Sequence, residues 1–122
     1  MKDLYAFYGS FRMGMSNHDL YKDSIQFIQT NTAKGFELYS LGEYPYAIKS
    51  EDMNQIMVVE IYKITNKIVQ SAIHVLEINA GYYRDKVNLE GLEAYIYLFK
   101  KRGNEIRVKS GDWVQFFRDN SK

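Results

Sequence analysis

The sequence predicts an α+β domain in which a strongly curved sheet, or a small mixed β-barrel, carries flanking helices. The expected elements follow the order strand, loop, helix, two strands, helix and two strands, which lacks the regular alternation of a doubly wound parallel sheet. Tyr and Phe, at 11 and 7 of 122 residues, favour pleated strands. Pro occurs once and no Ser/Gly/Pro-rich linker is present, so we expect a single domain over residues 1–122.

Hydrophobic periodicity and the residues that start or stop each segment set the expected elements. They are strands over residues 4–8, 36–41, 55–64, 82–89 and 92–100, helices over about 17–30 and 66–81, and a short terminal segment over 111–117. Ser16 or Asn17 is a suitable N-cap for the first helix, and Asn66 for the second. The second helix has the clearer apolar stripe, formed by Ile68, Val69, Ala72, Ile73 and Leu76. Glu90-Gly91 is expected to form the turn between the last two strands.

Charge and composition argue against several classes of partner. The net charge is +1, with both signs interspersed, whereas nucleic-acid binders usually carry a basic stripe. The one basic cluster, Lys100, Lys101 and Arg102, lies beside Gly103 and indicates a solvated turn. No apolar run approaches the roughly 18 residues of a membrane-spanning helix. We therefore expect neither a nucleic-acid nor a membrane partner.

The reactive residue types narrow the chemistry further. Cysteine is absent, which removes disulfides, thiol nucleophiles and thiolate metal sites together. The N-terminus lacks the apolar run of a signal peptide, and with the lack of cysteine this favours a cytoplasmic location. His18 and His74 are isolated histidines, so we expect no metal site. Ser10 and Ser16 lie outside any GxSxG elbow, and nothing in the sequence supports a serine triad.

The loop that begins at Tyr8-Gly9-Ser10-Phe11-Arg12 is the first candidate site. A glycine at the end of a strand lets the backbone approach a ligand closely, and successive N–H groups with a following helix can hold an anion. Gly9 and Gly14 have the spacing of a phosphate-binding loop, but Met15 replaces the required lysine, which excludes nucleotide hydrolysis. An ordinary strand-to-helix turn remains the alternative for this loop.

Glu77 is the second candidate, because it lies at the margin of the apolar face of the second helix. Burial there would disfavour its charged form and raise its pKa towards neutrality, as a general acid or base requires. The alternative is a boundary glutamate that points to solvent. Similarly, the aromatic pairs Tyr82-Tyr83 and Tyr44-Pro45-Tyr46 are expected in the core or at a sheet edge more often than at a ligand.

The order of these motifs resembles one known family. The run from Tyr8 to His18, Tyr-Gly-Ser-Phe-Arg-Met-Gly-Met-Ser-Asn-His, resembles the N-terminal signature of the gamma-glutamyl cyclotransferase-like family, which includes gamma-glutamylamine cyclotransferases and plant avirulence-induced proteins. Further runs resemble its later motifs in order: Leu41–Pro45, Val59–Tyr62, Ile73–Glu77, Gly81–Arg84, Ala94–Tyr97 and Gly111–Trp113. Four residues depart from the pattern: Phe11, Val59, His74 and Ile78. They leave Glu77 intact but bear on the shape of the pocket and thus on the substrate.

The resemblance implies a small mixed β-barrel with helices and a chemistry without metal or organic cofactor. In the family, the α-amino group of a gamma-glutamyl compound attacks its own γ-carbonyl, releasing 5-oxoproline and a free amine. By this resemblance, the N–H groups of residues 8–11 hold the substrate carboxylate and Glu77 moves the protons. Tyr83 borders the pocket, and Arg12 is a further candidate for contacting the departing group. The expected partner is a small gamma-glutamyl amine or amino acid, and the expected assembly a monomer or weak homodimer.

Three other functions remain open from the sequence. The same scaffold could bind a small carboxylate ligand, such as 5-oxoproline, without turnover, and the four departures favour that alternative. It could act on another gamma-glutamyl conjugate, such as an antibiotic precursor or a glutamyl-tagged polyamine. Its aromatic residues could instead serve a protein–protein interface.

Overall fold

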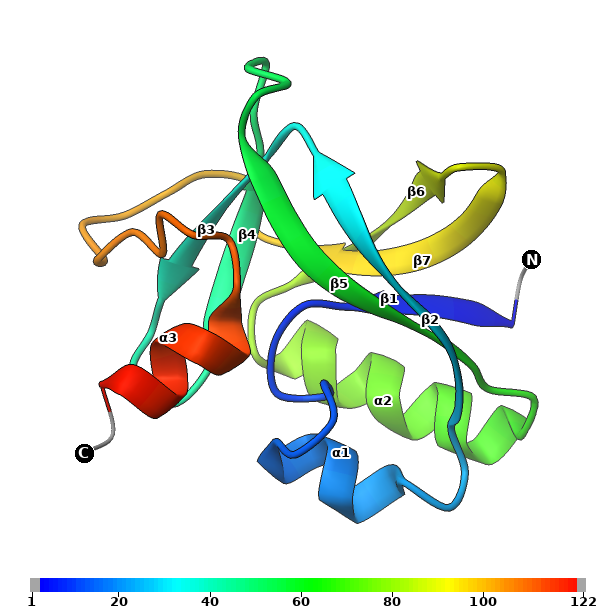
Figure 1. Cartoon of the computed structure of the whole chain (residues 1–122). Coiled ribbons are helices and arrows are strands. Elements are labelled where there is room, and N and C mark those ends of the chain that lie inside the picture. Colours follow the sequence, from blue (N-terminus) through cyan, green and yellow to red (C-terminus); the bar gives the residue numbers. More distant parts are fainter. Residues whose placement is uncertain (1–2, 121–122) are drawn as a thin grey trace.

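A strongly curled five-stranded sheet forms the centre of the protein in a computed structural model that describes residues 3–120 (Figure 1). The elements, in chain order, are β1 Leu4–Phe7, α1 Ser16–Tyr21, β2 Gln26–Lys34, β3 Phe36–Ser40, β4 Pro45–Lys49, β5 Ile56–Lys63, α2 Lys67–Asn79, β6 Tyr83–Leu89, β7 Leu92–Leu98 and α3 Trp113–Asp119. The mixed α+β class predicted from the sequence is confirmed.

The sheet is mixed because its central strand has one antiparallel and one parallel neighbour. The strand order is β2-β5-β1-β7-β6, with β1 antiparallel to β5 and parallel to β7. Strands β3 and β4 form a separate antiparallel pair. Among the described residues the five-stranded sheet curls without closing into a barrel, so the curved-sheet form of the prediction is the one observed.

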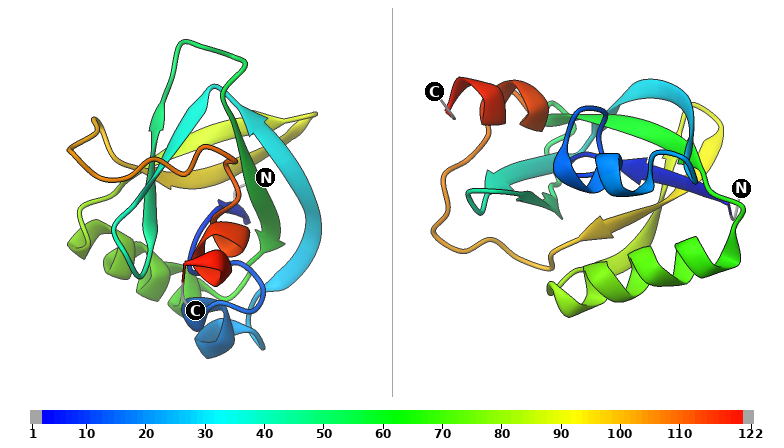
Figure 2. Two further views of the ribbon diagram at one scale, coloured as in Figure 1. Left: turned by 60° about the vertical axis from the view of Figure 1, so that its left-hand side comes forward. Right: turned by 90° about the horizontal axis from the view of Figure 1, so that it is seen from below.

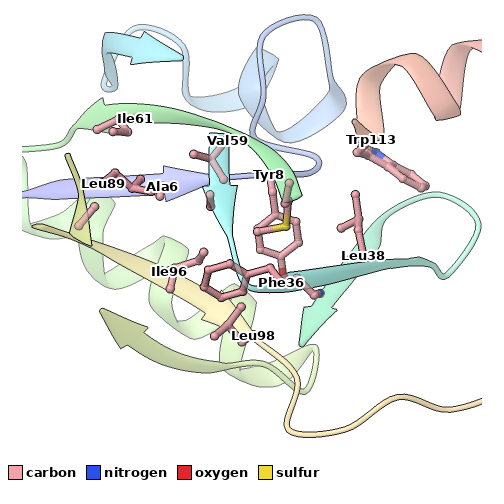
Figure 3. Packing of buried hydrophobic residues seen from close by; sticks show 14 of the residues in the cluster. Ala6, Tyr8, Phe36, Leu38, Val59, Ile61, Leu89, Ile96, Leu98 and Trp113 are labelled. Atoms are coloured by element: carbon pink, nitrogen blue, oxygen red, sulfur yellow. Dashed lines mark hydrogen bonds between the residues drawn. The ribbon is translucent and has the colours of Figure 1, made fainter. Parts of the chain in front are cut away.

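The sheet curls around one side of the core. Residues from β1, β3, β5, β7 and α3 interdigitate there, and the packed set includes Ala6, Tyr8, Leu38, Val59, Ile96 and Trp113 (Figure 3). A second buried cluster, richer in aromatic residues, includes Tyr5, Phe7, Phe11, Ile73 and Tyr97. Helix α2 runs along the sheet on this second side (Figure 2). The end of β1 and the loop after it are thereby held between two cores.

The predicted helix over residues 17–30 is wrong. Helix α1 covers only Ser16–Tyr21, and Gln26–Lys34 form the edge strand β2. Leu20 and Phe27 have a helical spacing of seven residues, but the positions between them that would continue an apolar face, Asp23 and Ser24, are polar. Strand β2 instead forms an antiparallel ladder with β5, with one register shift between Phe27 and Gln29. Tertiary pairing therefore overrides the weak helical pattern. Strand β4 was also not predicted.

The predicted N-cap of this helix is also wrong. Met15 occupies the cap position without a side-chain hydrogen bond. The backbone oxygen of Ser10 accepts hydrogen bonds from the N–H groups of Asn17 and His18, at 3.0 and 3.1 Å, and so satisfies the start of α1. The loop itself therefore caps the helix.

The later elements agree with the prediction, apart from the apolar stripe of α2. Asn66 caps α2 through its side-chain oxygen, which accepts from the N–H groups of Ile68 and Val69. The turn at Glu90 and Gly91 has the positive φ values of 53° and 89° that a tight hairpin requires. In the apolar stripe of α2 only Ile73 is fully buried, so only a narrow part of the helix surface packs against the sheet. None of the described helices has the length and apolar character needed to span a membrane.

Candidate active site

A cavity of about 220 Å³ opens between the loop after β1, the start of β4 and the C-terminal end of α2. Its walls are formed by Ala6, Phe7, Tyr8, Gly9, Ser10, Phe11, Asn17, Tyr44, Pro45, Leu76, Glu77, Ala80, Tyr82 and Tyr97. The fold thus brings together the two sites singled out in the sequence, the Tyr8–Phe11 loop and Glu77, although about 66 residues separate them in the chain.

The loop turns sharply because Gly9 lies against the ring of Pro45. A side-chain Cβ at position 9 would come within 2.7 Å of two Pro45 ring carbons, so only glycine fits without displacement. The Arg12 N–H donates to the Gly9 oxygen at 2.9 Å, and the Asn17 amide donates to the Ser10 hydroxyl at 2.8 Å. These bonds hold the loop in one shape across the floor of the cavity.

The loop leaves donors unused. In the described part of the chain, no intramolecular hydrogen bond has the N–H group of Gly9, Ser10 or Phe11 as its donor. Buried N–H groups are rarely left unpaired in proteins, so these three suit an anionic ligand oxygen. Helix α1 has only six residues, too few for the helix N-terminal contribution that the sequence suggested. An anion at this site would therefore depend on the loop backbone and not on the end of a helix.

Glu77 is half-buried in the last turn of α2 and faces the cavity. Burial raises the pKa of Glu77 to about 7, because a low-dielectric environment disfavours the charged carboxylate. No described residue forms an ion pair with its side chain, and it is the only Asp, Glu, Lys or Arg among the lining residues. A carboxyl group with this pKa can both accept and return a proton near neutral pH.

Three tyrosines form the wall next to Glu77. The Tyr8 hydroxyl donates to the Tyr97 backbone oxygen at 2.5 Å, and the Tyr82 hydroxyl donates to the Pro45 oxygen at 2.5 Å. Burial raises the pKa of each of these phenols, and the charge of Glu77 raises it further. They therefore remain protonated, rigid parts of the wall at neutral pH.

Tyr83 and Arg12 are not where the resemblance suggested. Tyr83 is absent from the cavity wall and packs against the other core, because neighbouring residues on an extended backbone point to opposite sides; Tyr82 lines the cavity instead. Arg12 also lies outside the wall. Its guanidinium is buried and contacts two carboxylates, which is a position that suits support of the loop. A contact between Arg12 and the departing group stays a prediction.

The partners of Arg12 belong to β5 and to the start of α3. Its Nε donates to Glu60 at 2.9 Å and its Nη1 to Asp112 at 2.8 Å. Glu60 also accepts from the Met13 N–H at 2.8 Å and the Tyr62 hydroxyl at 2.7 Å. Burial would raise the pKa of Asp112, but the bonds from Arg12 and from the Gln115 N–H lower it below its usual value. The network fixes the far end of the loop to two other elements.

The histidines have structural positions. His74 Nδ1 lies 2.8 Å from the Tyr97 hydroxyl, and the His18 ring packs on Tyr62 with 5.7 Å between the ring centres. Within residues 3–120, no group of three or more His, Cys, Asp or Glu side chains is arranged to hold a metal ion.

Sequence reasoning missed several lining residues. They are Asn17, Tyr44, Pro45, Leu76, Ala80, Tyr82 and Tyr97. The Ser-Asn-His and Tyr-Pro motifs contained three of them, Asn17, Tyr44 and Pro45, yet nothing in either motif shows that Asn17 would reach Ser10 or that Pro45 would pack on Gly9. These contacts depend on the tertiary fold.

Comparison with known sequences gives the family. Residues 5–115 match the family described as gamma-glutamyl cyclotransferase, AIG2-like. The chain belongs to this family. A Vibrio cholerae protein is 28% identical over 94% of this chain and 98% of its own, and a Methanocaldococcus jannaschii protein is 31% identical over 89% of this chain and 93% of its own. Both carry gamma-glutamylcyclotransferase as a provisional name. The resemblance noted in the sequence is confirmed.

Solved structures share the fold. The crystal structure of an uncharacterised Pyrococcus horikoshii protein superposes with a TM-score of 0.80 at 27% identity, covering 95% of this chain and 93% of that one. A mouse AIG2-like protein gives a TM-score of 0.69 at 15% identity, covering 84% and 80%. A Kluyveromyces lactis allophanate hydrolase shares the fold in 21% of its length, with a TM-score of 0.79 at 13% identity. The curled-sheet fold therefore occurs both alone and inside larger enzymes.

Proposed function

We propose that this member of the family is an enzyme that cyclises a gamma-glutamyl compound to 5-oxoproline and a free amine, with Glu77 as general acid and base. The observation that carries the proposal is that Glu77 and the loop with the free N–H groups line the same cavity. Glu77 can carry a proton, and the loop N–H groups suit a carboxylate. The glutamyl part of the substrate requires both features.

The cavity suits a zwitterionic glutamyl group. In this proposal the N–H groups of Gly9, Ser10 and Phe11 hold its α-carboxylate and ionised Glu77 attracts its α-ammonium, which is supported by their position in the wall of one cavity. Holding both ends bends the chain so that the α-nitrogen approaches the γ-carbonyl. This positioning turns the reaction into a ring closure, for which orientation alone supplies much of the rate acceleration.

The proton transfers balance without a cofactor. Glu77 takes one proton from the α-ammonium, and the freed amine forms the new C–N bond with the γ-carbonyl carbon. As the original amide C–N bond breaks, Glu77 returns a proton to the departing nitrogen, which leaves as an amine. The second proton of the attacking nitrogen leaves with the released amine as its ammonium ion. No electrons are transferred, and the pKa of about 7 for Glu77 suits both directions of transfer.

The test is release of 5-oxoproline by the purified protein from a panel of gamma-glutamyl amines, amino acids and peptides. Glu77→Gln keeps the shape but removes the proton acceptor, and we expect about 10²–10⁴-fold lower kcat. Glu51→Gln, in an exposed turn outside the cavity, is the matched control and should keep wild-type activity.

Two outcomes would contradict the proposal. Release at an unchanged rate by Glu77→Gln would remove Glu77 from the chemistry. No release from any panel member, while 5-oxoproline or glutamate still binds, would favour a non-catalytic binding module with the same cavity.

A further inference from the structure

We infer that His74 is a positioning residue for the cyclisation: its neutral ring accepts a hydrogen bond from the Tyr97 hydroxyl and so fixes the turn of α2 that carries Glu77. This inference rests on the proposed function and adds to it a residue outside the cavity wall. Three features carry it: the contact between His74 and Tyr97, the cation on the other side of the Tyr97 hydroxyl, and the place of Tyr97 in the site.

The contact joins α2 to the sheet one turn before Glu77. His74 Nδ1 lies 2.8 Å from the hydroxyl oxygen of Tyr97, a buried residue of β7. Residues three apart on a helix lie on neighbouring parts of one face, so Glu77 projects beside this contact. Within α2 only Ile73 is fully buried. A directional bond from His74 therefore adds a restraint that packing alone supplies weakly.

The direction of this hydrogen bond follows from Arg84. Arg84 in β6 is the cross-strand partner of Tyr97, so the two side chains project from the same face of the sheet. Burial raises the pKa of the Tyr97 phenol, whereas the charge of Arg84 and its hydrogen bond to the phenol lower it. A guanidinium only donates hydrogen bonds, so the Tyr97 oxygen accepts from Arg84 and its O–H is left to donate to His74 Nδ1. His74 then carries its proton on Nε2.

Tyr97 connects the two halves of the candidate active site. Its backbone oxygen accepts from the Tyr8 hydroxyl at 2.5 Å, and the Tyr8 hydroxyl accepts from the Ala47 N–H at 3.2 Å. Its side chain is bound to His74 in α2, and both Tyr97 and Glu77 line the cavity. The separation of Glu77 from the loop that begins at Tyr8 thus depends on how firmly Tyr97 is held.

Removal of the acceptor should slow the chemistry more than it weakens binding. We expect His74→Leu to lower kcat for 5-oxoproline release by about 10–100-fold, because a misplacement of about 1 Å can cost up to about 100-fold. KM should change by less than about threefold, since the loop keeps its supports at Gly9 and Arg12. The rise of kcat/KM with pH through about 7 should remain, because Glu77 is still the base.

A conservative variant separates the hydrogen bond from the bulk of the ring. His74→Asn places an amide oxygen near the position of Nδ1 and should recover kcat to within about threefold of the wild type. Tyr97→Phe removes the donor and should match His74→Leu. The double variant should be no slower than either single one, because each removes the same interaction. Ser71→Ala, at an exposed position of α2 outside the cavity wall, is the control and should keep the wild-type kcat.

The tautomer of His74 gives a test that is independent of activity. The chain has two histidines, so a nitrogen NMR spectrum of histidine-labelled protein is simple, and His74→Asn assigns the signals. At pH 8 we expect Nδ1 of His74 to have the chemical shift of an unprotonated ring nitrogen and Nε2 that of a protonated one. Tyr97→Phe should shift the Nδ1 signal, because its hydrogen bond is lost.

The possible failures differ in what they overturn. A proton on Nδ1, or a kcat of His74→Leu within about threefold of the wild type, would overturn the inference and leave the cyclisation chemistry in place. The inference would also fail if folded His74→Asn, checked by far-UV circular dichroism, were as slow as His74→Leu. If His74→Leu does not fold, His74→Asn and Tyr97→Phe carry the comparison. Absence of 5-oxoproline from every gamma-glutamyl compound with the wild type would overturn the proposed function itself, and the inference with it.

Discussion

At the scale of single residues, the burial of Glu77 makes the folded protein less stable when its carboxyl group is ionised. The carboxyl group has a folded pKa of about 7 against an ordinary value of 4.5 because it is buried. The folded state therefore binds this proton more tightly than the unfolded chain does. The stabilisation is fully present below pH 4.5 and is lost as the pH rises through 7, so the form with ionised Glu77 is the less stable one.

A neutral replacement should therefore stabilise the protein at high pH. We expect Glu77→Gln to increase the free energy of unfolding by about 2–3 kcal/mol at pH 8, since each pKa unit corresponds to about 1.4 kcal/mol, and to have little effect at pH 4.5. Urea unfolding at both pH values checks this. An equal effect at the two pH values would mean that ionisation of Glu77 is not the cause.

The same pKa gives the activity a pH dependence. If ionised Glu77 accepts the proton, kcat/KM should rise with pH through about 7, and that rising limb should be missing in Glu77→Gln. The measurement is kcat/KM against pH for the wild type and for the residual activity of Glu77→Gln, with the same substrate.

At the scale of elements, Arg12 joins three parts of the chain. It ends the cavity loop, contacts Glu60 in β5 and contacts Asp112, which caps α3 through the Gln115 N–H. Removing one member of a buried ionic network leaves the other charges uncompensated. The loop would lose its support at the same time, even though Arg12 is outside the cavity.

We expect Arg12→Ala to destabilise the protein by about 3–5 kcal/mol, as measured by urea unfolding. Asp112→Asn keeps a good N-cap but removes one charge, and should cost less. Lys101→Ala, an exposed control, should change stability by less than about 0.5 kcal/mol. A cost for Arg12→Ala as small as that of the control would show that the network contributes little.

The elements also show what the sequence could and could not predict. Helix α2, strands β6 and β7 and their turn followed from caps, periodicity and a positive-φ dipeptide, which are local features. Strand β2 did not, because its conformation comes from pairing with β5, about 30 residues away. Within the site, Glu77 and the loop were predicted by resemblance. That Tyr82 lines the cavity in place of Tyr83 could not be predicted, because it depends on which face of the extended chain turns inward.

At the scale of the whole molecule, the segment between β7 and α3 ties the two sheets together. The N–H of Ser40 and the N–H of Val108 connect it to β3 at 2.9 and 2.8 Å, through the oxygens of Ile106 and Leu38. The Gly111 oxygen accepts from the Val58 N–H in β5 at 2.8 Å. One segment thus contacts both sheets, and α3 follows directly. We expect the two sheets and α3 to unfold as one cooperative unit.

Gly111 is the residue on which this connection depends. Its φ is +73°, and a Cβ there would overlap the carbonyl oxygen of Ile56 and lie 2.9 Å from the carbonyl carbon. Backbone atoms cannot move aside as a flexible side chain can. We expect Gly111→Ala to lower the free energy of unfolding by at least about 2 kcal/mol, the combined effect of backbone strain and overpacking.

Two probes separate a global effect from a local one. Trp113 is the single tryptophan and is fully buried at the start of α3, so its fluorescence reports on that helix, while far-UV circular dichroism reports on the whole chain. The two urea transitions should coincide in the wild type, and in Gly111→Ala they should shift together to lower urea. If only the fluorescence transition shifts, α3 detaches separately, and the segment does not unite the sheets into one folding unit.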